Sequence, residues 1–251
     1  MNVSLYQAAA AMNVNARWQE LISENLAASS IPGFKKQELS FSAIQAGMMP
    51  QGDISKPGTA QAFALPSASV FTNFSAGDLK PTGVNTNLAL EGDGFFEVQL
   101  PNGTRGYTRD GEFRLNAQSQ LVTKQGFLVM GESGPLQLDA GNGAAISVSP
   151  AGEVSQGTES KGALKVVNFQ NPNLLTPVGG GMFEARDASL QPDTGAKATV
   201  RQGWIESGNT SAPAEMANLI TAMRSFEANQ RIVQLHDERM GRVISELGNT
   251  N

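Results

Sequence analysis

The chain has 251 residues, of which 40% are apolar and 16% are charged, so it can bury a core in one or two domains. Its net charge of −5 and its lack of a basic stripe exclude a general nucleic-acid binder, because such proteins neutralise phosphates with clustered Lys and Arg. The absence of cysteine excludes disulfide frameworks and cysteine metal sites.

Residues 3–29 have the periodicity of a helix. Its two apolar rows are Leu5, Ala8, Ala9 and Met12, and Val14, Trp18, Leu21 and Ile22. The helix should end at "SSIPGFKK", because the position before a proline disfavours helical backbone and a glycine follows. The N-terminal sequence lacks a basic start and a long apolar run, so we expect neither a cleaved signal peptide nor a membrane-spanning segment.

Residues 33–87 have a different composition. The run "MMPQGDISKPGTAQ" is rich in proline, glycine and polar residues, which predicts an extended linker. The following "SVFTNFSAGDLKPTG" leaves room for a short strand before a turn.

Residues 88–205 have the pattern of a β-domain. Phe96, Val98 and Leu100 alternate with polar residues, which is the period of a strand. Asn102-Gly103 and Asp110-Gly111 are hairpin signals, and Pro150-Ala151-Gly152 separates two further short runs. Many short strands at such spacing predict a compact sheet or a barrel-like domain.

Residues 212–248 form the clearest predicted helix, with Ser211 as N-cap. Alternating steps of three and four define a predicted seam: Met216, Leu219, Met223, Phe226, Gln230, Val233, Asp237, Met240, Ile244 and Leu247. Further apolar residues lie off this seam, so the helix should touch more than one neighbour. Those neighbours are other subunits or, alternatively, the β-domain. Asp237 either meets a polar partner or marks a point where the seam opens.

No catalytic motif is complete. Phosphate-loop, dinucleotide-binding, EF-hand and nucleophile-elbow spacings are absent, and the single histidine, His236, cannot build a histidine metal site. Asp93 and Asp110 each precede a glycine, as turn residues do. Arg105, Arg109 and Arg114 are expected on a solvated strand face, and Trp18 and Trp204 are expected to be packing anchors. We therefore predict no catalytic, cofactor or metal site, and no cofactor.

Three motifs together resemble the bacterial flagellar basal-body rod protein family, the axial proteins of rod and hook. "ENLAASSIPGFKK" is similar to the N-terminal signature of the family through Asn25, Leu26, Gly33, Phe34 and Lys35, although Ala28 and Ser30 replace its usual asparagines. "LALEGDGFFEVQLPNGTRGYTRDGEFRLN" resembles the middle domain, and "GWIESGNTSAPAEMANLITAMRSFEANQRIV" resembles the C-terminal helix. Chain length and "GESGPL" favour the proximal rod protein, whereas "FFEVQLPNGTRGYTRDGEF" is about as close to the distal one.

The resemblance implies an α+β fold in which terminal helices pair as a coiled-coil inner domain around an inserted, mainly β outer domain. The expected segments are 1–32 (N-terminal helix), 33–87 (linker), 88–205 (β-domain) and 206–251 (C-terminal helix). The expected assembly interface comprises Trp18, Leu21, Asn25, Met216, Leu219, Met223, Phe226, Val233, Met240, Ile244 and Leu247.

The implied function is that of a structural subunit of the periplasm-spanning rod, exported by the flagellar type III apparatus without a cleaved signal. Its partners would be further copies in a helical assembly and other rod and hook proteins, with no nucleic acid and no membrane insertion. Two alternatives remain open at this point. One is a secreted β-domain that binds carbohydrate or another ligand and is trimerised by its coiled coil. The other is a hydrolase that uses Asp93 and Asp110.

Overall fold

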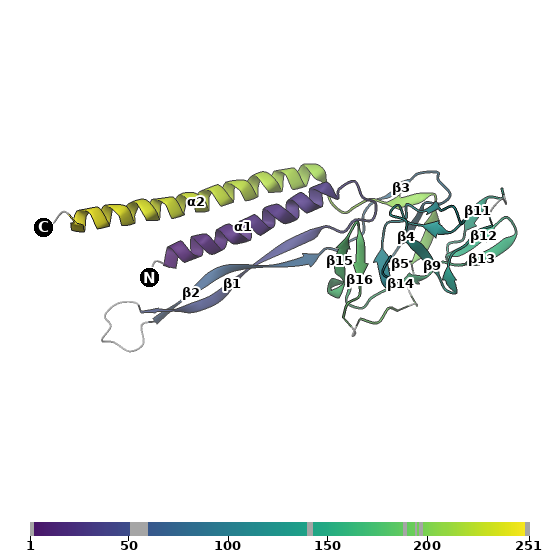
Figure 1. Ribbon diagram of the computed structural model, residues 1–251, viewed down its shortest axis with the longest axis horizontal. Coiled ribbons are helices and arrows are strands. Elements are labelled where there is room, and N and C mark those ends of the chain that lie inside the picture. The colour runs from purple at the N-terminus through teal and green to yellow at the C-terminus, as the bar shows by residue number, and fades with distance from the viewer. Residues whose placement is uncertain are drawn as a thin grey trace. The chain divides into compact units, whose positions relative to one another are not determined.

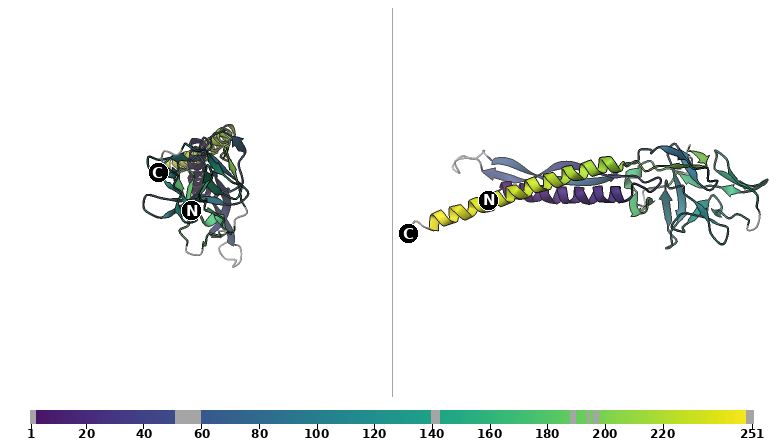
Figure 2. Two further views of the ribbon diagram at one scale, coloured as in Figure 1. Left: turned by 90° about the vertical axis from the view of Figure 1, so that its right-hand side faces the viewer. Right: turned by 90° about the horizontal axis from the view of Figure 1, so that it is seen from above.

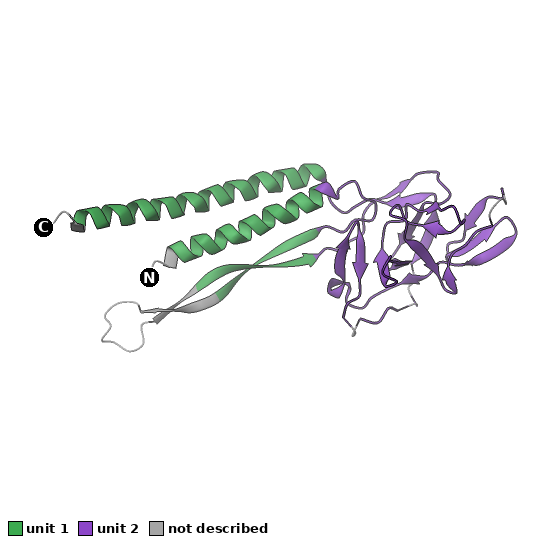
Figure 3. Ribbon diagram, in the orientation of Figure 1, with its two compact units in different colours: residues 1–26, 37–71, 212–251 green, residues 27–36, 72–211 purple. Residues whose placement is uncertain are grey.

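The computed structural model describes residues 3–50, 60–139, 143–187, 190–193, 195 and 198–248. The chain divides into two compact units, which Figure 3 colours separately. Unit 1 consists of Met1–Leu26, Gln37–Phe71 and Ala212–Asn251, and unit 2 consists of Ala27–Lys36 and Thr72–Ser211. Helices at both ends and a mostly β middle give the α+β class that the sequence predicts.

Unit 1 contains the two long helices, α1 (Val3–Ala27) and α2 (Ala212–Gly248). They lie side by side and run in opposite directions, on which the views in Figures 1 and 2 agree. Both predicted helices are confirmed. The helix α2 begins directly after Ser211, with Pro213 in its first turn, where the missing N–H of proline costs no intrahelical hydrogen bond.

Two long strands, β1 (Gln37–Pro50) and β2 (Ala60–Thr72), pair as a two-stranded sheet. The sequence predicted an extended linker here, and residues 51–59 of that stretch lie outside the described residues. The structure differs because pairing satisfies the backbone groups that the two strands turn toward each other, although their side chains show no strict apolar alternation. Trp18 of α1 packs edge-to-face on Phe41 of β1, with ring centroids 5.6 Å apart.

Unit 2 is built around one large sheet with smaller sheets beside it. The large sheet has the order β15 (Thr176–Gly179), β16 (Met182–Glu184), β6 (Arg105–Thr108), β5 (Phe95–Gln99), β9 (Leu128–Gly131), β8 (Leu121–Val122) and β7 (Arg114–Leu115), with β10 (Gly134–Pro135) on β9 and β14 (Val166–Val167) on β5. The smaller sheets are β11 (Ile146–Val148), β12 (Glu153–Gln156) and β13 (Glu159–Ala163), then β17 (Thr199–Gln202) with β4 (Leu88–Glu91), and β18 (Trp204–Glu206) with β3 (Leu79–Pro81). A 3-10 turn, η1 (Pro172–Leu174), precedes β15.

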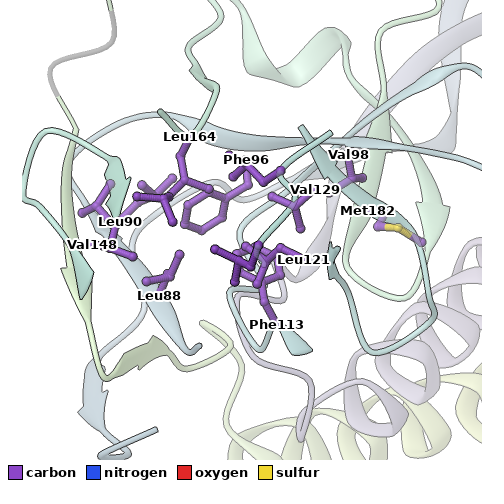
Figure 4. Packing of buried hydrophobic residues seen from close by; sticks show 14 of the residues in the cluster. Leu88, Leu90, Phe96, Val98, Phe113, Leu121, Val129, Val148, Leu164 and Met182 are labelled. Atoms are coloured by element: carbon purple, nitrogen blue, oxygen red, sulfur yellow. The ribbon is translucent and has the colours of Figure 1, made fainter. Parts of the chain in front are cut away.

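The central strand β5 separates two hydrophobic clusters. Phe96 and Val98 belong to the larger cluster, part of which Figure 4 shows, and Phe95 belongs to a second cluster with Tyr107. Successive side chains of a strand point to opposite faces, so the alternation read from the sequence places one residue set in each core. Unit 2 therefore encloses apolar side chains on both faces of its main sheet.

One of the two predicted hairpins is confirmed and the other is wrong. Asn102-Gly103 lies between the antiparallel strands β5 and β6, with Gly103 at φ +80°. Asp110-Gly111 joins β6 to β7, but β7 pairs with β8 and not with β6. The backbone of Gly111 instead lies directly against that of β4, where an added Cβ would lie 1.6 Å from the carbonyl oxygen of Leu88. The glycine thus permits a close approach of the two backbone segments.

Candidate assembly surface

One face of α2 is less exposed than the others. Its members follow alternating steps of four and three, as expected where one side of a helix faces a neighbouring element. They are Glu215, Leu219, Ala222, Phe226, Asn229, Val233 and His236, which we call the inner row. Ala222 is fully buried and Glu215 nearly so, whereas every side chain from 237 to 246 is exposed. Burial therefore decreases along the helix.

The predicted seam and the inner row agree only in part. Leu219, Phe226 and Val233 are common to both, but Met216 and Met223 are 53% and 48% exposed. Their neighbours Glu215 and Ala222 take the inward positions. A small residue such as Ala222 lets another element approach closely, which a ranking by side-chain hydrophobicity does not detect.

The rest of the predicted seam is exposed or lies beyond the described side chains. Met240 and Ile244 are exposed, as are Gln230 and Asp237, while the side chain of Leu247 lies outside the described residues. Asp237 is exposed in the single chain, and both alternatives for it, a polar partner or an opening of the seam, stay predictions. Asn229, which is not part of the predicted seam, belongs to the inner row, and its Nδ2 donates to the carbonyl of Ser225.

The predicted residues of α1 lie on its covered face. Leu21 and Asn25 are buried, and Trp18 is half-buried. The Nδ2 of Asn25 donates to the carbonyl of Gln37 at 2.8 Å, and its Oδ1 accepts from the Gln37 N–H at 2.9 Å. Asn25 therefore fixes the start of β1 against α1 within unit 1. Whether these residues also contact other subunits stays a prediction.

A buried ionic cluster lies in unit 2, and sequence reasoning missed it. Lys35 Nζ donates to Glu206 Oε1 at 2.5 Å and to the carbonyl of Ser75 at 2.8 Å. Arg109 reaches Glu206 Oε2 at 3.3 Å and the carbonyl of Gly92 at 2.7 Å. The cluster joins three distant segments: the N-terminal signature, the end of β6 and the last residue of β18.

Burial dominates the electrostatics of this cluster. Desolvation lowers the pKa of Lys35, and the neighbouring Glu206 carboxylate offsets part of that effect. Desolvation likewise lowers the pKa of Arg109, and Glu206 again opposes it. The expectation of a solvated face is wrong for Arg109, which is buried, whereas Arg105 and Arg114 are exposed. An isolated sequence position does not reveal a partner 97 residues away.

Backbone contacts hold the same segments together. Gly33 has φ +64°, and an added Cβ would lie 2.2 Å from the backbone carbon of Arg109. The Gly33 N–H donates to the carbonyl of Glu206 at 2.7 Å. Asn209 accepts from the Lys36 N–H through Oδ1 and donates through Nδ2 to the carbonyl of Asn73. The Gly-Phe-Lys signature is therefore a docking segment within unit 2.

Comparison with known proteins identifies the relatives of this chain. Residues 89–156 match the model of the flagellar hook protein FlgE/F/G D1 domain, and residues 201–246 match that of the flagellar basal body rod FlgEFG protein C-terminal region. The flagellar basal-body rod protein FlgG of Buchnera aphidicola subsp. Schizaphis graminum is 31% identical over 236 residues, covering 88% of this chain and 90% of the relative.

The chain belongs to the flagellar basal-body rod protein family. FlgG of Borreliella burgdorferi is 29% identical over 256 residues, covering 95% of this chain and 96% of the relative. FlgF of Caulobacter vibrioides is 29% identical over 253 residues and covers both chains completely. The first matched region of this rod protein runs from β4 to β12, and the second runs from β17 along α2.

The two aspartates of the rod protein occupy different environments. Asp93 is exposed, whereas Asp110 is buried, and desolvation raises the pKa of Asp110 to about 6. Asp110 Oδ1 accepts from the Glu112 N–H at 2.9 Å, the pattern of an Asx turn. The described residues hold no group of three or more His, Asp or Glu side chains placed to bind a metal.

The remaining singled-out residues take part in packing. Trp204 is half-buried, with the guanidinium carbon of Arg201 5.7 Å from its ring centroid, and His236 lies on the inner row. Among the described helices, none combines the length and the apolar character that crossing a bilayer requires.

Proposed function

We propose that this rod protein is a non-catalytic structural subunit that polymerises helically into the hollow drive shaft of the flagellar basal body. The observation that carries this proposal is the exposed apolar surface of α2, formed by Met216, Ile220, Met223, Ile232, Leu235, Met240, Val243 and Ile244. A helix that is apolar on several sides needs several packing neighbours. Further copies of the chain provide them in a helical stack.

The inner domain is a coiled coil of α1 and α2. Two observations support this pairing: the helices lie side by side in both views, and the inner row has alternating four- and three-residue spacing. The inner row includes Glu215 and Asn229, which select a register more than they add stability.

The segment we propose is the proximal rod, on the basis of chain length and the "GESGPL" segment. Its partners are other copies of the chain and the adjoining rod and hook proteins. The subunit reaches the periplasm by the flagellar export route, without a cleaved signal peptide.

Electron microscopy of basal bodies tests this proposal. A short peptide tag inserted at the exposed Asn102-Gly103 turn, where an added Cβ meets no atom within 4 Å, should leave cells motile and label the rod with gold-conjugated antibody. If the subunit belongs to the proximal rod, the label should lie at the cytoplasmic end of the rod. Deleting the gene should then leave basal bodies that lack the rod beyond that end. Label at the outer end would assign the distal segment. Motile deletion cells, or a closed trimer with ligand affinity, would contradict the rod function.

A further inference from the structure

The chain passes between its two units at four points, which follow residues 26, 36, 71 and 211 (Figure 3). On the side of unit 2, three stretches lead to these points: 27–36, 72–78 and 206–211. We call these stretches the first, second and third root of unit 1. The pieces of unit 1, with its two helices and its β1–β2 pair, all continue from these roots.

Asn209 belongs to the third root and forms hydrogen bonds with the other two. Its Oδ1 accepts from the Lys36 N–H at 2.8 Å, and its own N–H donates to the carbonyl of Phe34 at 3.1 Å. Its Nδ2 donates to the carbonyl of Asn73 at 2.7 Å and lies 3.2 Å from the carbonyl and hydroxyl oxygens of Ser75. One residue therefore bridges all three roots.

Backbone hydrogen bonds reinforce these bridges. The Asn73 N–H donates to the carbonyl of Lys36 at 2.9 Å, and the Ser207 N–H donates to the carbonyl of Asp78 at 2.8 Å. All of these donors and acceptors lie within unit 2. The roots should therefore stay joined in a free subunit, even where the helices of unit 1 are frayed.

Joined roots lower the entropy cost of building unit 1. Unit 2 lies between α1 and α2 in the sequence, and bringing distant segments of a chain together costs loop-closure entropy. We propose that Asn209 is a positioning residue for assembly, which holds the three roots together so that unit 1 folds in a single arrangement when the subunit joins the rod. This inference rests on the rod function proposed above.

Amide hydrogen exchange in the free subunit tests the joined roots directly. In the wild type, the amides of Lys36, Asn73 and Asn209 should be protected while those of 3–26 exchange quickly. Asn209→Ala should accelerate exchange of these three amides by roughly tenfold or more, because their hydrogen bonds open, and should leave the amides of β5 protected. Unprotected amides of Lys36 and Asn73 in the wild type would overturn the proposal.

Asn116→Ala is the matched control. Asn116 is half-buried like Asn209, but its side chain hydrogen-bonds only to Gln118 and Gln120, within the same turn of unit 2. Both variants should lower the urea midpoint of unit 2 by similar amounts. Only Asn209→Ala should abolish swimming and remove rods from electron micrographs. Equal swimming of the two strains would mean that Asn209 serves the stability of unit 2 alone.

A conservative variant keeps the test decisive if Asn209→Ala does not fold. Asn209→Asp retains the acceptor for the Lys36 N–H and loses the donor to Asn73 and Ser75. The Lys36 amide should then stay protected, while swimming falls below that of the wild type. Full swimming of this variant would overturn the proposal, because its second root no longer receives the hydrogen bond of Asn209.

The outcomes separate the positioning role from the rod function. Normal swimming of the Asn209→Ala strain overturns the positioning role and leaves the rod function standing. Normal swimming after deletion of the gene overturns the rod function itself. Loss of rods in the Asn209→Ala strain, with β5 still protected and the Asn116→Ala strain motile, establishes the positioning role.

Discussion

The two units of this protein differ in how completely each one buries its own apolar residues. Unit 2 holds both large hydrophobic clusters, whereas unit 1 contains thirteen of the sixteen large apolar side chains that are exposed in the described chain. Three of its buried residues, Asn15, Asn25 and Glu215, are polar. Its two-stranded sheet is also a motif that is marginal in isolation. Unit 2 thus buries most of its large apolar side chains, whereas unit 1 leaves many of them exposed.

The largest expected effect is loss of assembly through a single change in unit 1. Val233→Asp removes roughly 1.5–3 kcal/mol of apolar burial and adds a charge to the inner row, which contains no Lys or Arg. We expect a soluble subunit with folded unit 2 that does not enter the rod, and non-motile cells. Swimming assays and circular dichroism of the purified variant measure both effects.

The control for this variant is Gln234→Asp, because Gln234 is the exposed neighbour of Val233. It adds the same charge one position away and should leave cells motile. Normal swimming of the Val233→Asp strain would show that the inner row is not needed for assembly.

The second prediction concerns amide hydrogen exchange in the free monomer. Helices that lack most of their packing partners are marginal in water, so the amides of 3–26 and 212–246 should exchange quickly. The amides of β5 and of its neighbour β9, in the middle of the large sheet, should exchange only through global unfolding. Protection of equal strength in both units would mean that unit 1 is stable without neighbours.

The third prediction tests the buried cluster of unit 2. Lys35→Met removes the hydrogen bonds of Lys35 to Glu206 Oε1 and to the carbonyl of Ser75, and leaves Arg109, at 3.3 Å, as the remaining cation beside Glu206. Breaking a buried ion pair by removing one partner is costly. We expect unit 2 to lose roughly 3 kcal/mol of unfolding free energy, seen as a lower urea midpoint.

Lys124→Met is the matched control for this variant. It breaks the exposed pair of Lys124 with Glu112, and such pairs contribute less than about 1 kcal/mol. If Lys35→Met and Lys124→Met had equal effects, the cluster would not hold the N-terminal signature in place.

The smallest effect is expected at Asp110. Its pKa is raised from 3.8 to about 6 in the folded chain, so folding favours the protonated form. Wild-type unit 2 should therefore be less stable above pH 6 than near pH 4, by at most about 3 kcal/mol, and should gain stability as the pH falls through 6. Asp110→Asn removes this dependence and keeps the oxygen that accepts from Glu112.

Urea unfolding at pH 4.5 and pH 7.5 measures this difference. The Asp110→Asn variant should have a higher free energy of unfolding than the wild type only at pH 7.5. The double variant with Asp93→Asn should still assemble and swim. Loss of function in a folded double variant would contradict the purely structural role of both aspartates.

Periodicity along the chain determined much of the fold. The three- and four-residue spacing of apolar residues marks α1 and α2, and the two-residue alternation around Phe96 marks the central strand β5. These elements follow from local rules, because a helix or strand with one covered face must repeat its apolar residues at its own period. The Asn102-Gly103 hairpin was predictable for the same reason, since its backbone conformation depends on those two residues.

Tertiary structure alone decided the rest. The pairing of β1 with β2 satisfies backbone hydrogen-bonding groups of both strands. The side chains of these strands carry no clear pattern, so their composition indicated a linker. The side of α2 that faces inward depends on how closely a neighbouring element approaches Ala222. Because Ala222 faces inward, Met216 and Met223 lie on an exposed side of the helix. The partner of Lys35 is Glu206, 171 residues along the chain. No local pattern encodes such a pair, because the cost of burying each charge is offset only where the fold brings the two charges together.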